Sequence, residues 1–300
     1  MKILVYGGKG WIGNQFKEFL DIKQIPYVIS QTRLEYMNDV LLDLEQHKPT
    51  HVVSFLGRTH GVADGKVYST IDYLEQSGKI KDNLRDNLFV PIIIAQACKE
   101  KSRDENQIHF TYLGTGCIFT YDDHHPFELE ENGFQENDVP NFFGSGYSVV
   151  KGNTDQLMHI LFNDDCLNLR IRMPITNEEN PRNFITKITH YKKICSIKNS
   201  MTVLPDFMPI ILDLMTKKQV GTLNLTNPGL ISHDRILELY KDHVDSNFVW
   251  ENFTIEEQNE ILASARSNNY LDTKKLEQLY PELPDIETSV IHMLKTFKKN

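Results

Sequence analysis

Short apolar runs alternate with segments of helical periodicity along the first 171 residues of the chain. The apolar runs, which are typical of strands buried in a parallel sheet, cover residues 2–6, 27–30, 51–55, 108–113 and 167–171. Between them, helical spacing predicts helices at about 11–21, 36–47, 68–101 (interrupted near Gly78) and 147–162. This alternation predicts an α/β protein whose parallel sheet carries helices on both faces.

The first turn between a strand and a helix is rich in glycine. Gly7, Gly10 and Gly13 are spaced as G-x-x-G-x-x-G, and Trp11 and Ile12 complete the loop. Such glycines let the backbone approach a pyrophosphate, which then rests at the N-terminus of the following helix. We therefore expect a Rossmann-type sheet in which these five residues contact a dinucleotide. The ring of Trp11 is expected to pack the first helix rather than stack on a ligand.

The alternation of strands and helices ends after Pro174. Prolines then divide shorter elements, at positions 181, 205, 209 and 228. We therefore expect an NADP-binding Rossmann domain over residues 1–172 and a smaller C-terminal lobe over 173–300. That lobe is expected to bind the substrate rather than to add more sheet, although some of its strands and helices could return to the first domain.

The tip of the second strand should carry the residue that reads the adenosine ribose. The sequence there contains no carboxylate before Arg33. An acid would bind the 2'-hydroxyl of NAD and repel a 2'-phosphate, whereas an arginine attracts the phosphate. Arg33 therefore favours NADPH over NADH. A solvated surface arginine is the alternative, and the nearby Glu35 keeps NADH possible.

A tyrosine and a lysine lie four residues apart on the predicted helix 147–162. Tyr147 and Lys151 therefore share one helix face. A neighbouring cation favours the phenolate, which would make Tyr147 a usable proton donor or acceptor near neutral pH.

The fourth strand ends at Thr115, with Cys117 two residues further on. In an extended backbone both side chains point to the same side, and ligands of such sheets bind at the carboxyl ends of the strands. Thr115 can donate a hydrogen bond to a carbonyl group. Cys117 can exchange a proton with carbon if nearby positive charge favours its thiolate, or it can be a small buried filler.

Composition excludes several other classes of protein. Apolar residues make up 40% of the 300 residues, the net charge of −9 is spread along the chain, and no basic stripe predicts nucleic-acid binding. No apolar stretch is long enough to cross a membrane, and no signal peptide is recognised. The four scattered cysteines favour reduced thiols in the cytoplasm. No metal is expected, because the sequence Asp122-Asp123-His124-His125 lies in one polar loop.

Several unusual strings resemble the extended short-chain dehydrogenase/reductases and, more narrowly, the nucleotide-rhamnose synthase epimerase/reductases. The resemblance covers the whole chain. Its specific stretches are Gly10–Gly13, Thr115–Phe119, Val139–Phe142, Arg172–Ile175, Pro181–Ile188, Asn199–Leu204 and Arg266–Asn269.

The resemblance implies a reaction and a set of residues. The family converts a nucleotide-4-keto-6-deoxyglucose, here UDP-4-keto-6-deoxyglucose, into the L-rhamnose form by 3,5-epimerisation and NADPH reduction at C4. By position, Thr115, Tyr147 and Lys151 serve the reduction, and Cys117 and Lys187 form the epimerisation pair. The resemblance also implies cofactor contacts from Gly57 and Asn87, and homodimerisation through helices 68–101 and 147–162. Separately, Arg266, Asn268 and Asn269 could hold the diphosphate or the base of the nucleotide, or they could be polar surface residues, and Asn183 is a further candidate for a substrate contact.

Two rival functions stay open at this stage. A 4-ketoreductase similar to the dTDP-4-dehydrorhamnose reductases needs no thiol, so Cys117 discriminates against it. A catalytically idle nucleotide-binding subunit would be expected to lack the catalytic set. Two departures from the family pattern are Gly146, where a bulky residue is expected before Tyr147, and His60-Gly61 near the cofactor. Lys187 could also be a solvated helix lysine.

Overall fold

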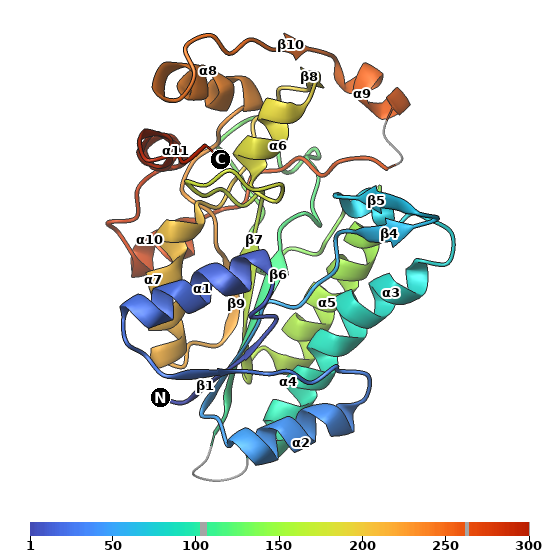
Figure 1. The fold of residues 1–300 in the computed structure, drawn as a ribbon, viewed down its shortest axis with the longest axis vertical. Helices are drawn as coiled ribbons and strands as arrows, with labels where there is room; N and C mark the ends of the chain where they lie inside the picture. The colour runs from blue at the N-terminus through green and yellow to red at the C-terminus, as the bar shows by residue number, and fades with distance from the viewer. Residues whose placement is uncertain (103–106, 262–263, 300) are drawn as a thin grey trace. The chain divides into compact units, whose positions relative to one another are not determined.

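The computed structural model describes residues 1–102, 107–261 and 264–299 (Figure 1). A six-stranded sheet has the order β2-β1-β3-β6-β7-β9. The pairs β1–β2, β1–β3 and β3–β6 are parallel. The predicted fold class, a Rossmann-type α/β protein, is confirmed.

The chain divides into two compact units, whose segments interleave in the sequence. The first unit comprises residues 1–115, 146–169 and 208–223. The second comprises residues 116–145, 170–207 and 224–300. The predicted domain boundary after residue 172, and the substrate-binding role of residues 173–300, stay predictions.

Most sheet strands and their covering helices belong to the first unit. The strands are β1 (Ile3–Tyr6), β2 (Tyr27–Ile29), β3 (His51–Ser54), β6 (His109–Thr115), β7 (Cys166–Ile171) and β9 (Gly221–Asn224). The helices are α1 (Trp11–Ile22), α2 (Met37–His47), α3 (Ile80–Leu84), α4 (Val90–Lys101), α5 (Gly146–Phe162) and α7 (Leu204–Thr216). A π-helical turn, Arg85–Phe89, joins α3 to α4.

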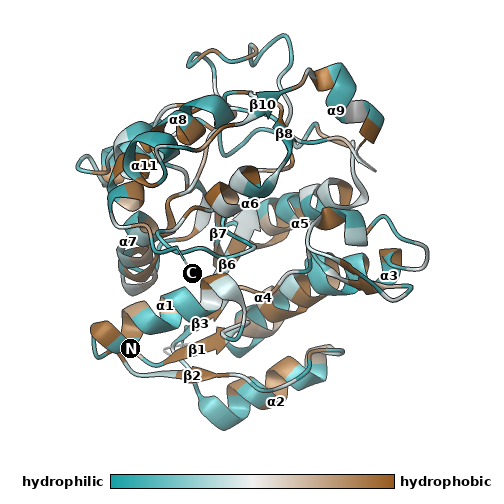
Figure 2. Cartoon of the chain, turned by 45° about the horizontal axis from the view of Figure 1, so that its top comes forward, coloured by the Kyte–Doolittle hydropathy of each residue, from teal (hydrophilic) through white to brown (hydrophobic). Residues whose placement is uncertain are grey.

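Alternate side chains of the strands pack against opposite helical layers. Leu4 and Tyr6 of β1 belong to a buried cluster with residues of α2, α4 and α5. On the other face, Phe16 of α1 contacts Phe55 at 5.2 Å between ring centroids. Figure 2 shows hydrophobic residues concentrated along β1 and β3 and on α4. Burial of these apolar side chains stabilises the sheet, whose strand ends carry the predicted site residues.

Two expectations about the elements were wrong. Tyr68, where a helix was predicted to begin, instead ends an antiparallel hairpin, β4 (Gly61–Ala63) and β5 (Lys66–Tyr68), which a 3₁₀ turn, Ile71–Tyr73, follows. The helix starts only at Ile80. The chain after Pro174 also adds sheet, because β9 is the sixth strand.

The second unit has its own apolar core. It contains α6 (Phe184–His190), α8 (His233–His243), α9 (Ile255–Ile261), α10 (Lys274–Leu279), α11 (Ile286–Lys295) and the short parallel pair β8 (Lys193–Ile194) and β10 (Glu251–Asn252). Side chains of α6, α8 and α11 bury one another around Met201 and Val203. Among the described residues of both units, no helix combines the length and apolar character that a membrane crossing requires.

Candidate active site

The glycine-rich loop of the first unit fits a dinucleotide pyrophosphate. Gly7 has a φ of +76°, and a Cβ on Gly13 would lie 2.3 Å from the Gly7 carbonyl oxygen. Gly10 caps α1 without a side-chain hydrogen bond, and the first turn of α1 has no acidic residue. The N-terminus of α1 therefore suits the negative charge of a bound anion. Trp11 and Ile12, both partly buried, begin α1.

Arg33 lies beside a carboxylate that comes from another part of the chain. Its Nη2 is 3.7 Å from Asp86 Oδ1, and 57% of its side chain is exposed. Arg58 and Arg85 also pair with Asp86, at 2.5 and 2.7 Å. Burial raises the pKa of Asp86, but hydrogen bonds from Arg85 and Arg58 outweigh that effect and lower it below its usual value. An ionised acid therefore organises the arginines around the predicted ribose reader.

Asn87 lies in the π-helical turn and fastens the loop that follows β3. Its Oδ1 accepts a hydrogen bond from the Arg58 amide at 2.8 Å, and its Nδ2 donates to the Arg58 carbonyl at 2.9 Å. A Cβ on Gly57 would meet the same Oδ1 at 3.3 Å. The Asn87 carbonyl accepts from the hydroxyl of Thr154 on α5 at 2.6 Å. Asn87 thus ties the loop carrying Gly57 to the helix that carries Tyr147 and Lys151.

Lys151 is buried and bonds to a residue that the sequence did not indicate. Its Nζ donates a hydrogen bond to the Tyr112 hydroxyl and lies 4.6 Å from the centroid of that ring. Burial raises the pKa of Tyr112 well above its usual value, and the nearby Tyr147 and Asp155 raise it further. Tyr112 therefore stays a neutral phenol that holds the ammonium and lies within electrostatic range of Tyr147.

The small residue before Tyr147 has a structural reason. The Gly146 amide, at the start of α5, donates to Glu75 Oε1 at 2.7 Å. A Cβ at Gly146 would lie 3.3 Å from both carboxylate oxygens of Glu75. The carboxylate satisfies the exposed helix end, which favours negative charge. Glu75 thus occupies the space next to Gly146.

Thr115 and Cys117 lie on opposite sides of the boundary between the two units. Thr115 ends β6 in the first unit and is 7% exposed. Cys117 belongs to the second unit and is partly buried. Tyr147 and Lys151 accompany Thr115 in the first unit, and Lys187 accompanies Cys117 in the second.

Positive charge surrounds Cys117 within the second unit. Burial lowers the pKa of Lys187, the charges of Arg182 and Arg266 lower it further, and interaction with Cys117 opposes this shift. Lys187 is therefore a partly buried amine in range of the thiol rather than a solvated helix lysine. Burial also lowers the pKa of Arg172, again opposed by Cys117.

One of the predicted substrate residues near the C-terminus, Asn269, holds the loop that carries Cys117. The Asn269 side chain donates to the carbonyls of Gly116 and Phe119, at 3.0 and 2.9 Å. The Asn268 Oδ1 accepts from Asn199 at 2.9 Å, and Arg266 donates to the Ser264 hydroxyl at 2.7 Å. Asn269 is fully buried, so a direct substrate contact from it stays a prediction.

Asn183 caps α6, the helix that carries Lys187. Its Oδ1 accepts from the Ile185 amide at 3.2 Å, and its Nδ2 donates to the carbonyls of Thr176 and Glu178, at 2.9 and 2.7 Å. The residue is fully buried. Its predicted substrate contact also stays a prediction, whereas its capping bonds fix the start of the helix.

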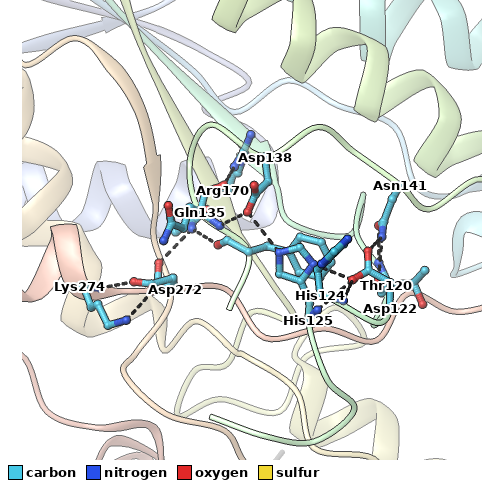
Figure 3. Close-up of polar contacts among 12 residues, drawn as sticks. Thr120, Asp122, His124, His125, Gln135, Asp138, Asn141, Arg170, Asp272 and Lys274 are labelled. Atoms are coloured by element: carbon cyan, nitrogen blue, oxygen red, sulfur yellow. Dashed lines mark hydrogen bonds and ion pairs between the residues drawn. The ribbon is translucent and has the colours of Figure 1, made fainter. Parts of the chain in front are cut away.

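The histidines of the polar loop are held by internal hydrogen bonds (Figure 3). Asp122 Oδ1 lies 2.8 Å from His125 Nδ1, and its Oδ2 accepts from Asn141 at 2.8 Å. The His125 ring stacks on Phe134 with centroids 3.7 Å apart. Within the described part of the chain, no three His, Cys, Asp or Glu side chains are grouped so that they could hold a metal ion.

The strand order, the glycine turn and the buried lysine of α5 define an extended short-chain dehydrogenase/reductase. The crystal structure of the L780 UDP-rhamnose synthase of Acanthamoeba polyphaga mimivirus matches with a TM-score of 0.92 and 49% identity, covering 99% of both chains. The chain belongs to the nucleotide-rhamnose synthase family of epimerase/reductases.

Two plant proteins are similar over nearly the whole chain. A bifunctional dTDP-4-dehydrorhamnose 3,5-epimerase/dTDP-4-dehydrorhamnose reductase of Arabidopsis thaliana is 39% identical, over 96% of this chain and 90% of its own. A trifunctional UDP-glucose 4,6-dehydratase/UDP-4-keto-6-deoxy-D-glucose 3,5-epimerase/UDP-4-keto-L-rhamnose-reductase of the same plant is 40% identical over 97% of this chain. The chain spans 41% of that trifunctional protein. No family model matches the chain.

Three functional candidates escaped the sequence analysis: Tyr112, Asp86 and Arg172. Tyr112 could have been noticed as a polar aromatic in a buried strand. Asp86 directly precedes Asn87, in a charged stretch of helix. Arg172 gave no separate signal, because its surroundings come from segments far apart in the sequence.

Proposed function

We propose that this chain converts UDP-4-keto-6-deoxy-D-glucose into UDP-L-rhamnose, by 3,5-epimerisation followed by NADPH-dependent reduction at C4. The observation that carries the proposal is Cys117, which interacts electrostatically with Lys187 and Arg172 within the second unit. A plain 4-ketoreductase needs no such thiol. The names of the relatives support the choice of reaction, and that of the viral relative favours UDP as the carrier.

The epimerisation uses the acidity that the C4 ketone gives to the hydrogens on C3 and C5. The Cys117 thiolate takes one of these protons, so that an S–H bond forms and the C–H electron pair moves into an enolate. The Lys187 ammonium gives a proton to the opposite face of the same carbon, and a new C–H bond replaces an N–H bond. Exchange with solvent then restores both groups. Hydrogen bonds from Thr115 and Tyr147 to the enolate oxygen contribute about 3 kcal/mol each.

The reduction uses the residues of the first unit. When bound, NADPH supplies the hydride that C4 accepts. Tyr147 donates its phenolic proton to the C4 oxygen, and Lys151 stabilises the phenolate that remains. Tyr112 keeps the Lys151 ammonium in place, because the hydroxyl of its neutral phenol accepts a hydrogen bond from it.

The preference for NADPH rests on Arg33. More than half of its side chain is exposed, so its guanidinium can reach a 2'-phosphate while Asp86 holds it from one side. Gly7, Gly10 and Gly13 provide the pyrophosphate turn. Gly57 and Asn87 line the next loop, from which we expect further cofactor contacts.

Two variants separate the two chemistries. Cys117→Ala should bind NADPH normally but stop solvent deuterium from entering C3 and C5, because no thiolate removes the protons. Tyr147→Phe should retain that exchange and lose the reduction. Mass spectrometry of the sugar nucleotide and the loss of NADPH absorbance measure the two steps. Undiminished exchange in Cys117→Ala would reduce the proposal to a 4-ketoreductase.

We further propose a cytoplasmic homodimer that pairs through α4 and α5. Apolar side chains are exposed on α5 and on the turn before α4: Ile160 at 71%, Leu161 at 50% and Phe89 at 44%. Exposed apolar residues that gather on neighbouring helices favour an interface. Sedimentation of the wild type and of Ile160→Glu tests the dimer, since the charged residue should shift the protein to a monomer.

A further inference from the structure

Arg172 is a buried cation whose hydrogen bonds all go to neutral oxygens. It follows β7, and 1% of its surface is exposed. The Nη1 atom donates to the Gly116 carbonyl at 3.1 Å and to the Ser267 hydroxyl at 2.9 Å. The Nη2 atom donates to Asn199 Oδ1 at 2.6 Å and to the Ser267 carbonyl at 3.1 Å. The Nε atom donates to the Ser200 carbonyl at 3.3 Å. The five N–H donors of the guanidinium are thus matched with five neutral acceptor contacts.

A buried charge without a counter-charge is costly, so an anion within range is stabilised. Among the described residues, the two acidic groups that act on Arg172 are Cys117 and Tyr121. Burial raises the pKa of Tyr121, which therefore remains a neutral phenol near neutral pH. Of the two, Cys117 is the group whose neighbour, Gly116, accepts a hydrogen bond from Arg172.

Arg172 also fixes the backbone next to Cys117. A Cβ on Gly116 would lie 3.0 and 3.2 Å from the Cγ and Cδ atoms of Arg172, so the stem of the arginine packs directly on this glycine. The Gly116 amide donates to the Ile171 carbonyl at 2.9 Å, and its carbonyl accepts from Arg172. The residue before the thiol is thus held on both sides by residues 171 and 172.

We propose that Arg172 is the positioning residue for Cys117: it holds the backbone at Gly116 and supplies a permanent buried charge beside the thiol. This deepens the proposed epimerase function and rests on it. Because Arg172 is fully buried, it acts through Cys117 and does not touch the sugar.

The other charged groups that face this site cannot replace Arg172. Lys187 faces Cys117, and Arg182 and Arg266 face Lys187. Burial and these two arginines lower the pKa of Lys187, which suits an amine that gives up and regains a proton in each turnover. A guanidinium keeps its charge throughout. Arg172 is the guanidinium that interacts with Cys117 itself, whereas Arg182 and Arg266 interact with Lys187.

The test is the pH profile with which iodoacetamide alkylates Cys117, followed by peptide mass spectrometry on the full-length protein. In Arg172→Gln, alkylation at neutral pH should be about tenfold slower, with its midpoint shifted upward by about one pH unit. Arg172→Lys should restore most of the rate. The matched control is Arg170→Gln, two residues earlier on β7, where an equally buried guanidinium lies over the Phe119 ring. That control should keep the wild-type profile.

A second variant keeps Arg172 and places a compensating negative charge beside it. Asn199→Asp is nearly isosteric and places a carboxylate at the 2.6 Å partner of Nη2. The alkylation profile of Asn199→Asp should show the same upward shift. This variant therefore tests the proposal even if Arg172→Gln does not fold. Melting temperature and NADPH affinity establish that each variant is folded.

The possible outcomes are distinct. Profiles of folded Arg172→Gln and Asn199→Asp that coincide with the wild type would overturn the role of Arg172. A shift in Arg170→Gln of equal size would also overturn it, since any buried charge would then suffice. Neither result depends on sugar turnover. Failure of the epimerase function itself appears separately, as undiminished deuterium exchange in Cys117→Ala.

Discussion

Each of the two units buries a cation beside a reactive side chain, but the partners of the two cations differ. Lys151 in the first unit bonds to the phenol of Tyr112, with Tyr147 and Asp155 in electrostatic range of that phenol. Arg172 in the second unit bonds to backbone carbonyls, a hydroxyl and an amide.

The difference corresponds to two kinds of catalytic support. A lysine among titratable groups can take part in moving a proton. An arginine among fixed dipoles supplies constant charge and constant geometry. The first arrangement suits the final protonation at C4, and the second suits a thiol that must stay in one position beside a fixed charge.

Replacing the lysine of the first unit by the cation type of the second should have the largest effect on activity. Lys151→Arg should lower kcat for the reduction roughly 100-fold or more, because a planar guanidinium does not place its charge at Tyr112 and Tyr147 as the compact ammonium does. Steady-state NADPH oxidation measures the loss. A near-wild-type rate for this variant would show that charge alone supports Tyr147.

Acid should weaken both regions next, because burial also lowers the pKa of His233 in the second unit to about 4. Burial lowers the pKa of His51 in the first unit to about 4, and His109 and Lys218 contribute. The unfolded chain, whose histidine pKa is near 6.5, binds this proton first, so stability is complete above that pH and declines as the pH falls toward 4. The loss amounts to about 3 kcal/mol. Urea midpoints at several pH values should show this slope in the wild type and a smaller slope in His51→Gln.

Removing the phenol hydroxyl of Tyr112 should show how much Lys151 depends on this hydrogen-bond partner. In Tyr112→Phe the ammonium loses a buried acceptor, so we expect a loss of about 2 kcal/mol in unfolding free energy. The reduction should slow more than the deuterium exchange at C3 and C5. Equal slowing of both would contradict the assignment of Tyr112 to the reductase residues.

An exposed charge should show the smallest effect on stability. Arg33→Ser removes a 3.7 Å ion pair that is open to solvent, so its unfolding free energy should change by less than about 1 kcal/mol. The KM for NADPH should nevertheless rise about tenfold, for lack of a phosphate partner, while that for NADH changes little. Equal changes for both cofactors would remove Arg33 from the 2'-phosphate site.

The sheet could be predicted where its strands are nearly continuous apolar runs. β9 was missed because Gly221–Asn224 contains only one large apolar residue, Leu223, and its burial results from neighbours brought by the fold. The β4–β5 hairpin did carry a local signal. Asp64 and Gly65 both have positive φ, and Asp-Gly is a preferred turn between hairpin strands.

The candidate site also contains residues that the sequence predicts and residues that only the fold reveals. Gly7, Gly10 and Gly13 follow from local spacing, since a turn and a helix N-terminus need few residues. Arg172 could not be assigned a role from spacing, because its acceptors are contributed by Gly116, Asn199, Ser200 and Ser267. Only the folded second unit brings these segments to one guanidinium.

Glu75 and Gly146 are a complementary pair, and the choice of one restricts the other. The carboxylate that closes the end of α5 occupies the volume that a side chain at position 146 would need. Redesign of the position before Tyr147 therefore has to begin at residue 75. Enlarging Gly146 alone displaces an acid from a helix terminus, whereas shortening Glu75 first opens room for the larger side chain.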